Sequence, residues 1–220
     1  MPQLSNLYLF LYNSLQSIGW ALALFRVVSN FVVTKSTDGA AYASAGELIC
    51  FLQTAAFLEV IHGAIGLVPS GALLPLMQWG GRTHFLLAIV NGINEVQELP
   101  SVFITFLAWS LSEVIRYPQY ALSSLRHCPY WITYLRYTSF IVLYPIGVGP
   151  GEMWLMYQAL PYIKEKHLYG DSLFGLPFSY YNFIQAVLLC YPFLWLKLYL
   201  HMFKQRKSKL AKQHTRKKKM

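Results

Sequence analysis

The sequence predicts an all-α membrane protein, a bundle of six transmembrane helices with the N- and C-termini cytoplasmic. The first observation behind this prediction is composition. Of the 220 residues, 55% are hydrophobic and 12% are charged, whereas about 25% of a soluble domain is charged. The second is the recurrence of long apolar runs, and the third is the concentration of lysine and arginine near the C-terminus. We therefore expect lipid around most of the chain.

Six segments are long and apolar enough to span a membrane, which takes roughly 20 mostly apolar residues. In chain order they are residues 7–33, 47–68, 72–94, 99–121, 131–158 and 178–203. The opening MPQLSN has no basic region and no small-residue cleavage site, so we expect a retained first span rather than a signal peptide. Five or seven spans fit the same runs. We divide the chain into a six-span membrane domain, 1–203, and a basic cytoplasmic tail, 204–220.

The orientation follows from the basic residues, which favour the cytoplasmic side. The chain from Lys197 onward is strongly basic, and an even number of spans places the N-terminus on the same side. The acidic connection at 91–100, NGINEVQELP, then lies on the far side and Arg126 on the near side. Lys164 and Lys166, in the far-side connection at 159–177, are exceptions to this bias.

The basic tail has more than one interpretation. It fits a solvated segment that fixes topology and contacts anionic lipid, and it lacks the aromatic residues and folded support of a nucleic-acid site. The last four residues, KKKM, resemble the dilysine retrieval signal of endoplasmic reticulum membrane proteins, with Lys217 and Lys218 as its lysines. This pattern favours a multi-pass protein of that membrane.

Ionisable residues inside the spans are informative, because each costs about 2.5–3.5 kcal/mol near the bilayer centre. Glu113 and Arg116 are three residues apart and can pair on one helix face. Arg136 can serve the same purpose or meet Glu152 across the bundle. The full set is Arg26, Glu59, His62, Arg82, His84, Glu113, Arg116, Arg136 and Glu152.

No pattern predicts a metal or another cofactor. Glu59 and His62 form one ExxH, whereas di-iron bundles need two and further glutamates, so we expect His62 to be a buried, hydrogen-bonded histidine. The sequence has no GxSxG elbow and no cysteine in a recognisable relation to a histidine. The three cysteines, Cys50, Cys128 and Cys190, are far apart and predict buried apolar residues rather than disulfides.

Tyr144 and Glu152 stand in YPIGVGPGEMW, an oddly polar stretch of the fifth span. A tyrosine and a glutamate differ widely in acidity, so together they suit proton transfer in opposite directions. Such a pair fits the elimination of water from a carbonyl compound, with one group removing a proton and the other assisting the departing hydroxyl. An interfacial tyrosine beside a structural carboxylate is the alternative.

Several stretches together resemble one known family. They are LYLFLYNSLQSIGWALALF, QTAAFLEVIHGAIGLVPSG, LSEVIRYPQY and WITYLRYTSFIVLYPIGVGPGEMWLMYQALP. The chain resembles the very-long-chain (3R)-3-hydroxyacyl-CoA dehydratases, also called protein-tyrosine-phosphatase-like proteins, and its plant members in particular. The resemblance covers nearly the whole chain, and the combination of EVIRY, LRYxxF, LYPxG and GE is specific.

The resemblance implies a six-span enzyme of the endoplasmic reticulum that needs no metal or redox cofactor. Such an enzyme dehydrates a 3-hydroxyacyl-CoA to the trans-2-enoyl-CoA in the third step of very-long-chain fatty acid elongation. Its partners are acyl-CoA, membrane lipid, the condensing enzyme and the two reductases. The family's catalytic tyrosine and glutamate match Tyr144 and Glu152. Residues for support or substrate binding are Glu113, Arg116, Arg136 and Tyr137.

The spacing of the pair departs from the family. Tyrosine and glutamate stand seven apart in YPxGxxxE but eight apart here, which on a regular helix leaves them about 80° apart. We therefore predict an interruption near Gly149–Gly151, either a kink, a π-bulge or a break, that returns Glu152 to the side of Tyr144. Glu152 as base with Tyr144 as acid, and the reverse, both fit. A non-catalytic relative that scaffolds the elongation complex is the alternative function.

Overall fold

The computed structural model describes residues 2–170 and 178–217, with side chains described for residues 3–170 and 178–210. Over these ranges every regular element is a helix and no strand occurs. The elements are α1 (Pro2–Thr34), α2 (Ala40–Ala55), α3 (Phe57–Ala64), α4 (Leu73–Thr83), the π-helix η1 (His84–Val90), α5 (Asn94–Gln97), α6 (Pro100–Ser124), α7 (Tyr130–Arg136), α8 (Phe140–Ile146), the π-helix η2 (Gly147–Met153), α9 (Trp154–Glu165) and α10 (Tyr180–Lys217).

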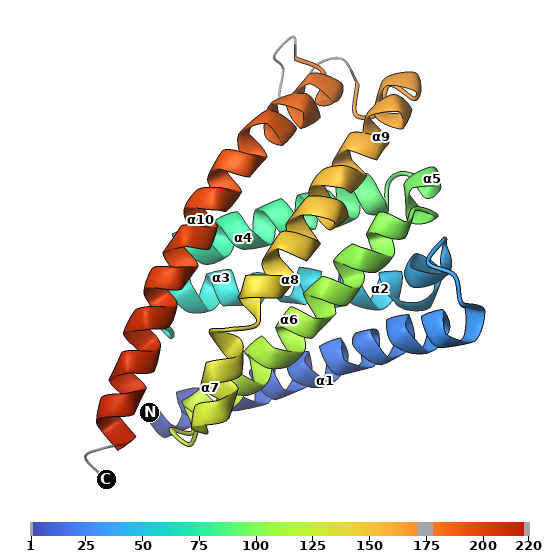
Figure 1. Ribbon diagram of the computed structural model, residues 1–220. Helices are drawn as coiled ribbons and strands as arrows, with labels where there is room; N and C mark the ends of the chain where they lie inside the picture. The colour runs from blue at the N-terminus through green and yellow to red at the C-terminus, as the bar shows by residue number, and fades with distance from the viewer. Residues whose placement is uncertain (1, 171–177, 218–220) are drawn as a thin grey trace.

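The helices of the described ranges combine into six rods, which follow the six predicted segments (Figure 1). The rods are α1, α2 with α3, α4 with η1, α6, α8 with η2 and α9, and α10. The second rod is interrupted at Ala56, which forms a turn between α2 and α3. The last two rods extend past the predicted ends at 158 and 203, because apolar periodicity marks where lipid ends and not where a helix ends.

In the described part of the chain, three helical stretches are long and apolar enough to cross a membrane: Gln3–Thr34, Ala40–Ala64 and Tyr180–Leu210. Their outward side chains are apolar and exposed, with Leu15 70% and Leu189 72% accessible. A soluble bundle would instead present polar residues on this surface. The fold is therefore that of an all-helical membrane protein.

The interior of the bundle is partly polar. Apolar residues such as Trp20, Phe106 and Ile184 form its core, at most 1% exposed. Buried among them are the polar side chains of Asn13, Gln16, Gln53, His62, Ser101, Thr105, Ser110, Glu113, Thr133 and Glu152. In a membrane protein, polar residues that face the interior mark a functional region.

The connections gather at two ends of the bundle. The described N-terminal and C-terminal ends lie at the same end, together with α7 (Figure 1). At the opposite end Lys166 Nζ binds both carboxylate oxygens of Glu95 at 2.7 Å, and the Gly39 amide donates to the Glu98 carbonyl at 3.2 Å. The 91–100 connection and the exceptional Lys166 therefore neutralise each other.

The cysteines are free, as expected, but their burial differs from the prediction. Cys50 and Cys128 are half-buried, and Cys190 is exposed on α10. The prediction of a buried Cys190 was wrong because an apolar residue on the outer face of a membrane helix meets lipid rather than protein.

Candidate active site

The predicted interruption of the fifth rod is confirmed as a π-helix. Between α8 and α9, residues Gly147–Met153 form η2. Two α-helical turns contain about 7.2 residues, and a π turn closes with i→i+5 bonds, which adds one residue. A separation of eight positions from Tyr144 to Glu152 thus comes close to two full turns when one of them is a π turn. The π-helix therefore supplies the irregularity that the spacing of the pair needs.

The sequence of η2 explains its position. Pro145 and Pro150 lack the N–H that an α-helix needs for its i→i−4 bond, so regular helix is weakened here. Gly147 and Gly151 are buried where η2 packs on α6. A Cβ at Gly151 would lie 2.7 Å from Thr105 Oγ1, and one at Gly147 would lie 3.2 Å from Ala108 Cβ. The glycines therefore permit a close approach that holds η2 on α6.

Glu152 is 8% exposed and held at both carboxylate oxygens. The Trp109 indole Nε1–H donates to Oε1 at 2.7 Å, and the Tyr191 hydroxyl donates to Oε2. The indole is a donor only, so it fixes this oxygen as an acceptor. Helices α6 and α10 thus orient the carboxylate of η2 from two sides.

Tyr144 lies in an aromatic cluster with α10. Its ring is stacked with those of Trp195 and Tyr199, with centroid distances of 6.4 and 6.2 Å. Among the described residues no hydrogen bond reaches its hydroxyl. The hydroxyl is thus not engaged by another described side chain.

Arg82 connects this site to a second polar cluster. Its Nη1 donates to Glu113 Oε1 at 2.5 Å, and its guanidinium carbon lies 4.0 Å from the centre of the Trp109 ring and 5.8 Å from that of Trp20. A cation over an indole face is attracted to it. Trp109 therefore contacts Arg82 through its face and Glu152 through its N–H.

The second cluster is a network of paired charges. Arg116 Nε binds Glu113 Oε2 at 2.5 Å, so the predicted pair is confirmed. Arg116 also reaches Glu59 at 3.2 Å, and the Tyr117 hydroxyl donates to Glu59 at 2.6 Å. Pairing is what makes such buried charges tolerable. Glu113 thus holds two arginines in place.

His62 is buried and hydrogen-bonded, as the sequence predicted. Its Nε2 lies 2.9 Å from the Tyr8 hydroxyl, and its ring meets Tyr12 edge-on at 5.1 Å. Its ExxH partner Glu59 is engaged elsewhere. Within residues 2–170 and 178–217 there is no group of three or more histidine, cysteine, aspartate or glutamate side chains able to hold a metal ion.

Arg136 and Tyr137 do not join the candidate site. Over the described ranges the hydrogen-bond partners of Glu152 are Trp109 and Tyr191, so of the two alternatives for Arg136 the contact with Glu152 is not the one seen. Arg136 ends α7, and its charge reaches Glu113. Tyr137 follows it, half-buried. The kink around residues 137–139, before α8, separates these residues from Glu152.

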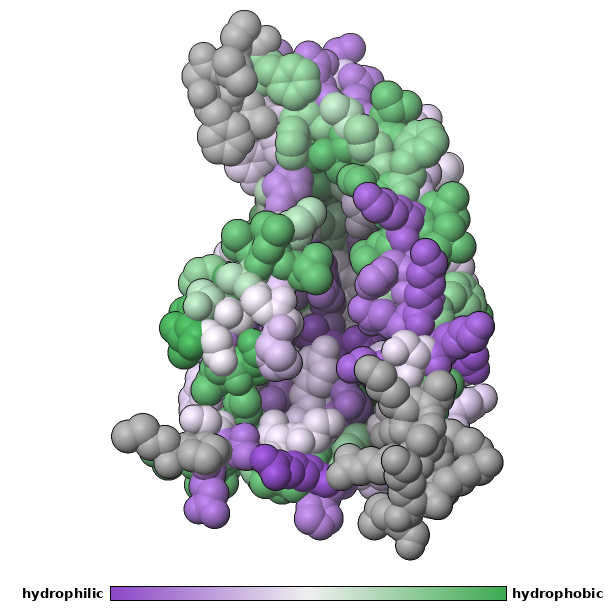
Figure 2. All heavy atoms as spheres, turned by 90° about the vertical axis from the view of Figure 1, so that its left-hand side faces the viewer, coloured by the Kyte–Doolittle hydropathy of each residue, from purple (hydrophilic) through white to green (hydrophobic). Residues whose placement is uncertain are grey.

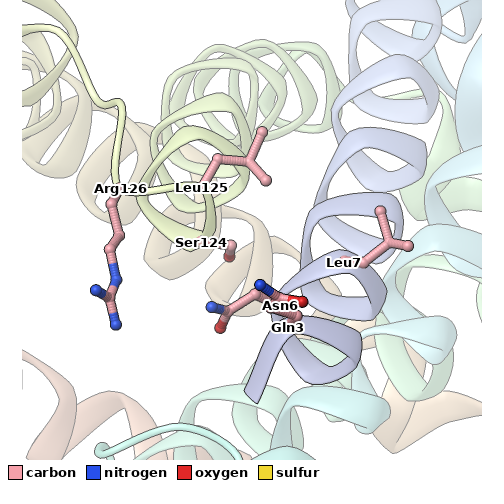
Figure 3. A pocket seen from close by; sticks show the side chains of 6 residues that line it. All are labelled: Gln3, Asn6, Leu7, Ser124, Leu125 and Arg126. Carbon is pink, nitrogen blue, oxygen red and sulfur yellow. The ribbon is translucent and has the colours of Figure 1, made fainter. Parts of the chain in front are cut away.

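The face bordered by α10 is hollowed, with hydrophilic side chains on the lower floor of the hollow (Figure 2). Two cavities lie near the start of α1. The smaller, of about 210 Å³, receives Gln3, Asn6 and Arg126 from α1 and the end of α6 (Figure 3). The larger, of about 510 Å³, is mainly apolar and is lined by Leu4, Ser5, Tyr8, Leu58, Ile61, His62, Ile65 and Leu67.

Three residues of the site were not predicted as such: Arg82, Trp109 and Tyr191. Trp109 lies on the helix face of Glu113 and Arg116, at i−4 and i−7, so helical spacing was a usable signal. Arg82 was recognised only as a charge inside a span. Tyr191 had no local signal, because it meets Glu152 only through the packing of α10.

Comparison with known proteins places these residues in context. A model of the family described as "Protein tyrosine phosphatase-like protein, PTPLA" matches residues 53–212. Human "Very-long-chain (3R)-3-hydroxyacyl-CoA dehydratase 2" is 37% identical over 94% of this chain and 82% of its own length. For the mouse protein of that name the values are 38%, 93% and 81%.

A plant relative is similar to the same extent. Rice "Very-long-chain (3R)-3-hydroxyacyl-CoA dehydratase PASTICCINO 2B" is 35% identical over 94% of both chains. Sequence identity to the rice protein is no higher than sequence identity to the human and mouse proteins, so these values do not single out the plant members of the family. No solved structure matches the chain.

Proposed function

The chain belongs to the protein tyrosine phosphatase-like family, PTPLA, and we propose that it removes water from a very-long-chain (3R)-3-hydroxyacyl-CoA to give the trans-2-enoyl-CoA. The family and the names of its relatives support this function. One structural observation supports the assignment to residues: the π-helix η2, between Tyr144 and the end of the motif, supplies the additional residue per turn that the eight-residue spacing needs. The chain is accordingly an enzyme, a hydro-lyase.

In the proposed mechanism Glu152 is the base and Tyr144 the acid. Glu152 takes the proton from C2, the C2–H electron pair passes through the thioester enolate into the C2=C3 double bond, and the C3–O bond breaks. The departing hydroxyl takes the proton of Tyr144 and leaves as water. Transfer of the proton from Glu152 to Tyr144 then restores both groups.

The hydrogen bonds of Glu152 support this direction. An ionised carboxylate accepts at both oxygens, and here both oxygens have a partner that donates. The Tyr144 hydroxyl, in contrast, has no acceptor within the described residues and is able to donate to a substrate oxygen. Donors fixed before the reaction also lower the cost of orienting the base.

For the membrane arrangement we propose six spans within residues 1–203, a basic tail at 204–220 and cytoplasmic termini. The shared position of the termini supports it (Figure 1), as does the pairing of Lys166 with Glu95, which removes one exception to the charge bias. Lys217 and Lys218 support location in the endoplasmic reticulum. Lys218 lies outside the described residues, and of Lys217 only the backbone is described.

The substrate and product suggest the partners of this enzyme. A 3-hydroxyacyl-CoA arises by reduction of the product of a condensing enzyme, and an enoyl-CoA is consumed by a second reductase. We propose that the chain acts beside these elongation enzymes, with the CoA at the basic cytoplasmic end and the acyl chain among the aromatic helices. No cofactor takes part in the proposed chemistry.

The decisive experiment compares variants of the purified protein in a dehydration assay. Tyr144→Phe and Glu152→Gln should each lower kcat by a factor of about 100 or more while leaving thermal unfolding unchanged. Tyr157→Phe, an exposed tyrosine on α9, is the matched control and should remain active. Wild-type rates in both variants would refute the residue assignment. An inactive wild-type protein that binds the elongation enzymes would identify a scaffold instead.

A further inference from the structure

We propose that Arg82 is a further substrate-binding residue, whose guanidinium edge Nε–Nη2 binds the thioester carbonyl oxygen of the acyl-CoA and stabilises the negative charge that develops there. This inference rests on the proposed dehydratase function. It deepens that function by assigning the part of the site that recognises the thioester.

The first argument is an unpaired edge of the guanidinium. Nη1 of Arg82 binds Glu113 at 2.5 Å. Nε and Nη2 are inaccessible to solvent, and neither has a hydrogen-bond partner among the described residues. The N–H groups of Nε and Nη2 lie on the same edge of the guanidinium and are directed to the same side. Arginine uses such a pair of parallel N–H groups to bind oxygen ligands. Buried donors without partners are rare and indicate a place for an acceptor.

The second argument is position. The guanidinium lies 4.0 Å above the Trp109 ring, and the N–H of the same ring donates to Glu152 at 2.7 Å. One indole ring thus separates the guanidinium from the proposed base. A carbonyl oxygen bound at this edge would belong to the same small region as the C2 carbon that Glu152 attacks.

A neighbouring donor strengthens this argument. Trp20 Nε1 is also buried without a partner in the described chain, and its ring centre is 5.8 Å from the Arg82 guanidinium carbon. Unpaired donors of α1 and α4 thus lie close to each other, and they come from other helices than the proposed acid and base, which belong to α8 and η2.

The chemistry explains why a cation is useful here. When Glu152 removes the C2 proton, the electron pair moves into the C1–C2 bond and the carbonyl oxygen becomes an enolate oxyanion. When the pair returns, C2=C3 forms, the C3–O bond breaks and the hydroxyl leaves with the Tyr144 proton. A preformed donor pair aimed at the oxyanion stabilises this intermediate more than the ground state.

A purely structural role would not need this arrangement. Glu113 already has a cationic partner, because Arg116 binds its other oxygen at 2.5 Å. A second arginine that only neutralised Glu113 would gain nothing by leaving two donors unpaired in the interior. Arg82 is therefore positioned by Glu113 and free to bind substrate with its remaining edge.

The test measures recognition of the carbonyl without turnover. A saturated acyl-CoA cannot be dehydrated, and its alkyl thioether analogue lacks only the carbonyl oxygen. The wild-type protein should bind the thioester at least tenfold more tightly than the thioether. Arg82→Met should reduce this preference to about one, and Arg82→Lys, which keeps a charge but not the fork, should reduce it in part. Arg26→Lys, at an exposed arginine of α1, is the control and should keep the preference.

The outcomes separate the two proposals. A preference that survives in Arg82→Met, or that is missing in the wild type, would overturn the assignment of Arg82. A preference that depends on Arg82 in a protein that dehydrates nothing would uphold the thioester site and refute the proposed reaction. In the dehydration assay Arg82→Met should lower kcat by about 10²–10³, the loss typical of one oxyanion donor.

Discussion

Replacement of Gly151 by alanine tests whether close packing of η2 on α6 shapes the site. The new methyl group would lie 2.7 Å from Thr105 Oγ1 and 3.5 Å from the Ile146 carbonyl oxygen. The first distance is shorter than carbon–oxygen contact allows, so η2 must move away from α6. Overpacking of this kind costs about 1–3 kcal/mol. At roughly 2–4 °C per kcal/mol for a chain of this size, the melting temperature should fall by several degrees, and dehydration should slow because Glu152 is the next residue.

Three further variants make this prediction specific. At Gly149 an added Cβ meets nothing within 4 Å, so Gly149→Ala should unfold like the wild type. Thr105→Ala removes the clashing oxygen and its 2.8 Å bond to the Ser101 carbonyl, which costs about 0.5–1.5 kcal/mol. The double variant Gly151→Ala, Thr105→Ala should thus recover at least 1 kcal/mol relative to additive effects. Thermal unfolding in detergent measures all four proteins. Additive losses, or a Gly151→Ala protein as stable as the wild type, would refute the packing argument.

Three further predictions concern the same region. Deletion of Pro150 shortens the Tyr144–Glu152 spacing to seven, about two α turns, and should leave a folded, active enzyme. Insertion of an alanine after Pro150 should instead inactivate the enzyme. An inactive deletion variant together with an active insertion variant would show that η2 does not align the pair. Tyr191→Phe removes the hydrogen bond to the Glu152 carboxylate, and a bond to a charged group is worth about 1.5–3 kcal/mol. This variant should have a kcat lowered roughly 10- to 100-fold and a KM that changes little. An unchanged kcat would show that Tyr191 does not position Glu152. Glu113→Gln leaves Arg82 and Arg116 without their shared carboxylate and should destabilise the fold by about 3–5 kcal/mol. Thermal unfolding measures this loss, and an unchanged melting temperature would contradict the prediction.

The helical class, the six rods and the break in the fifth rod were predictable, because they depend on local patterns. Apolar runs mark the rods, and the surplus of one residue between Tyr144 and Glu152 required an irregular turn. The pairing of Glu113 with Arg116 followed from spacing along a single helix.

The partners of Glu152 depend on packing, which local patterns do not specify. Trp109 and Tyr191 lie on helices 43 and 39 residues away in sequence. Which face of α6 or α10 meets η2 depends on helix rotation, and a helix with apolar residues on all sides does not reveal its rotation. For the same reason the sequence left open whether Arg136, close to Tyr144 in the chain, meets Glu152.

The π turn of η2 also bears on how the family is to be compared. A residue added to a regular helix would rotate everything beyond it by about 100°, whereas a π turn such as η2 takes up one additional residue within a single turn. Relative to the seven-residue spacing that the resemblance implies, η2 provides the place for that residue. A pair of side chains on one helix thus requires an angle rather than a fixed number of residues. Searches that require a fixed interval between tyrosine and glutamate would overlook chains that preserve the geometry by this means.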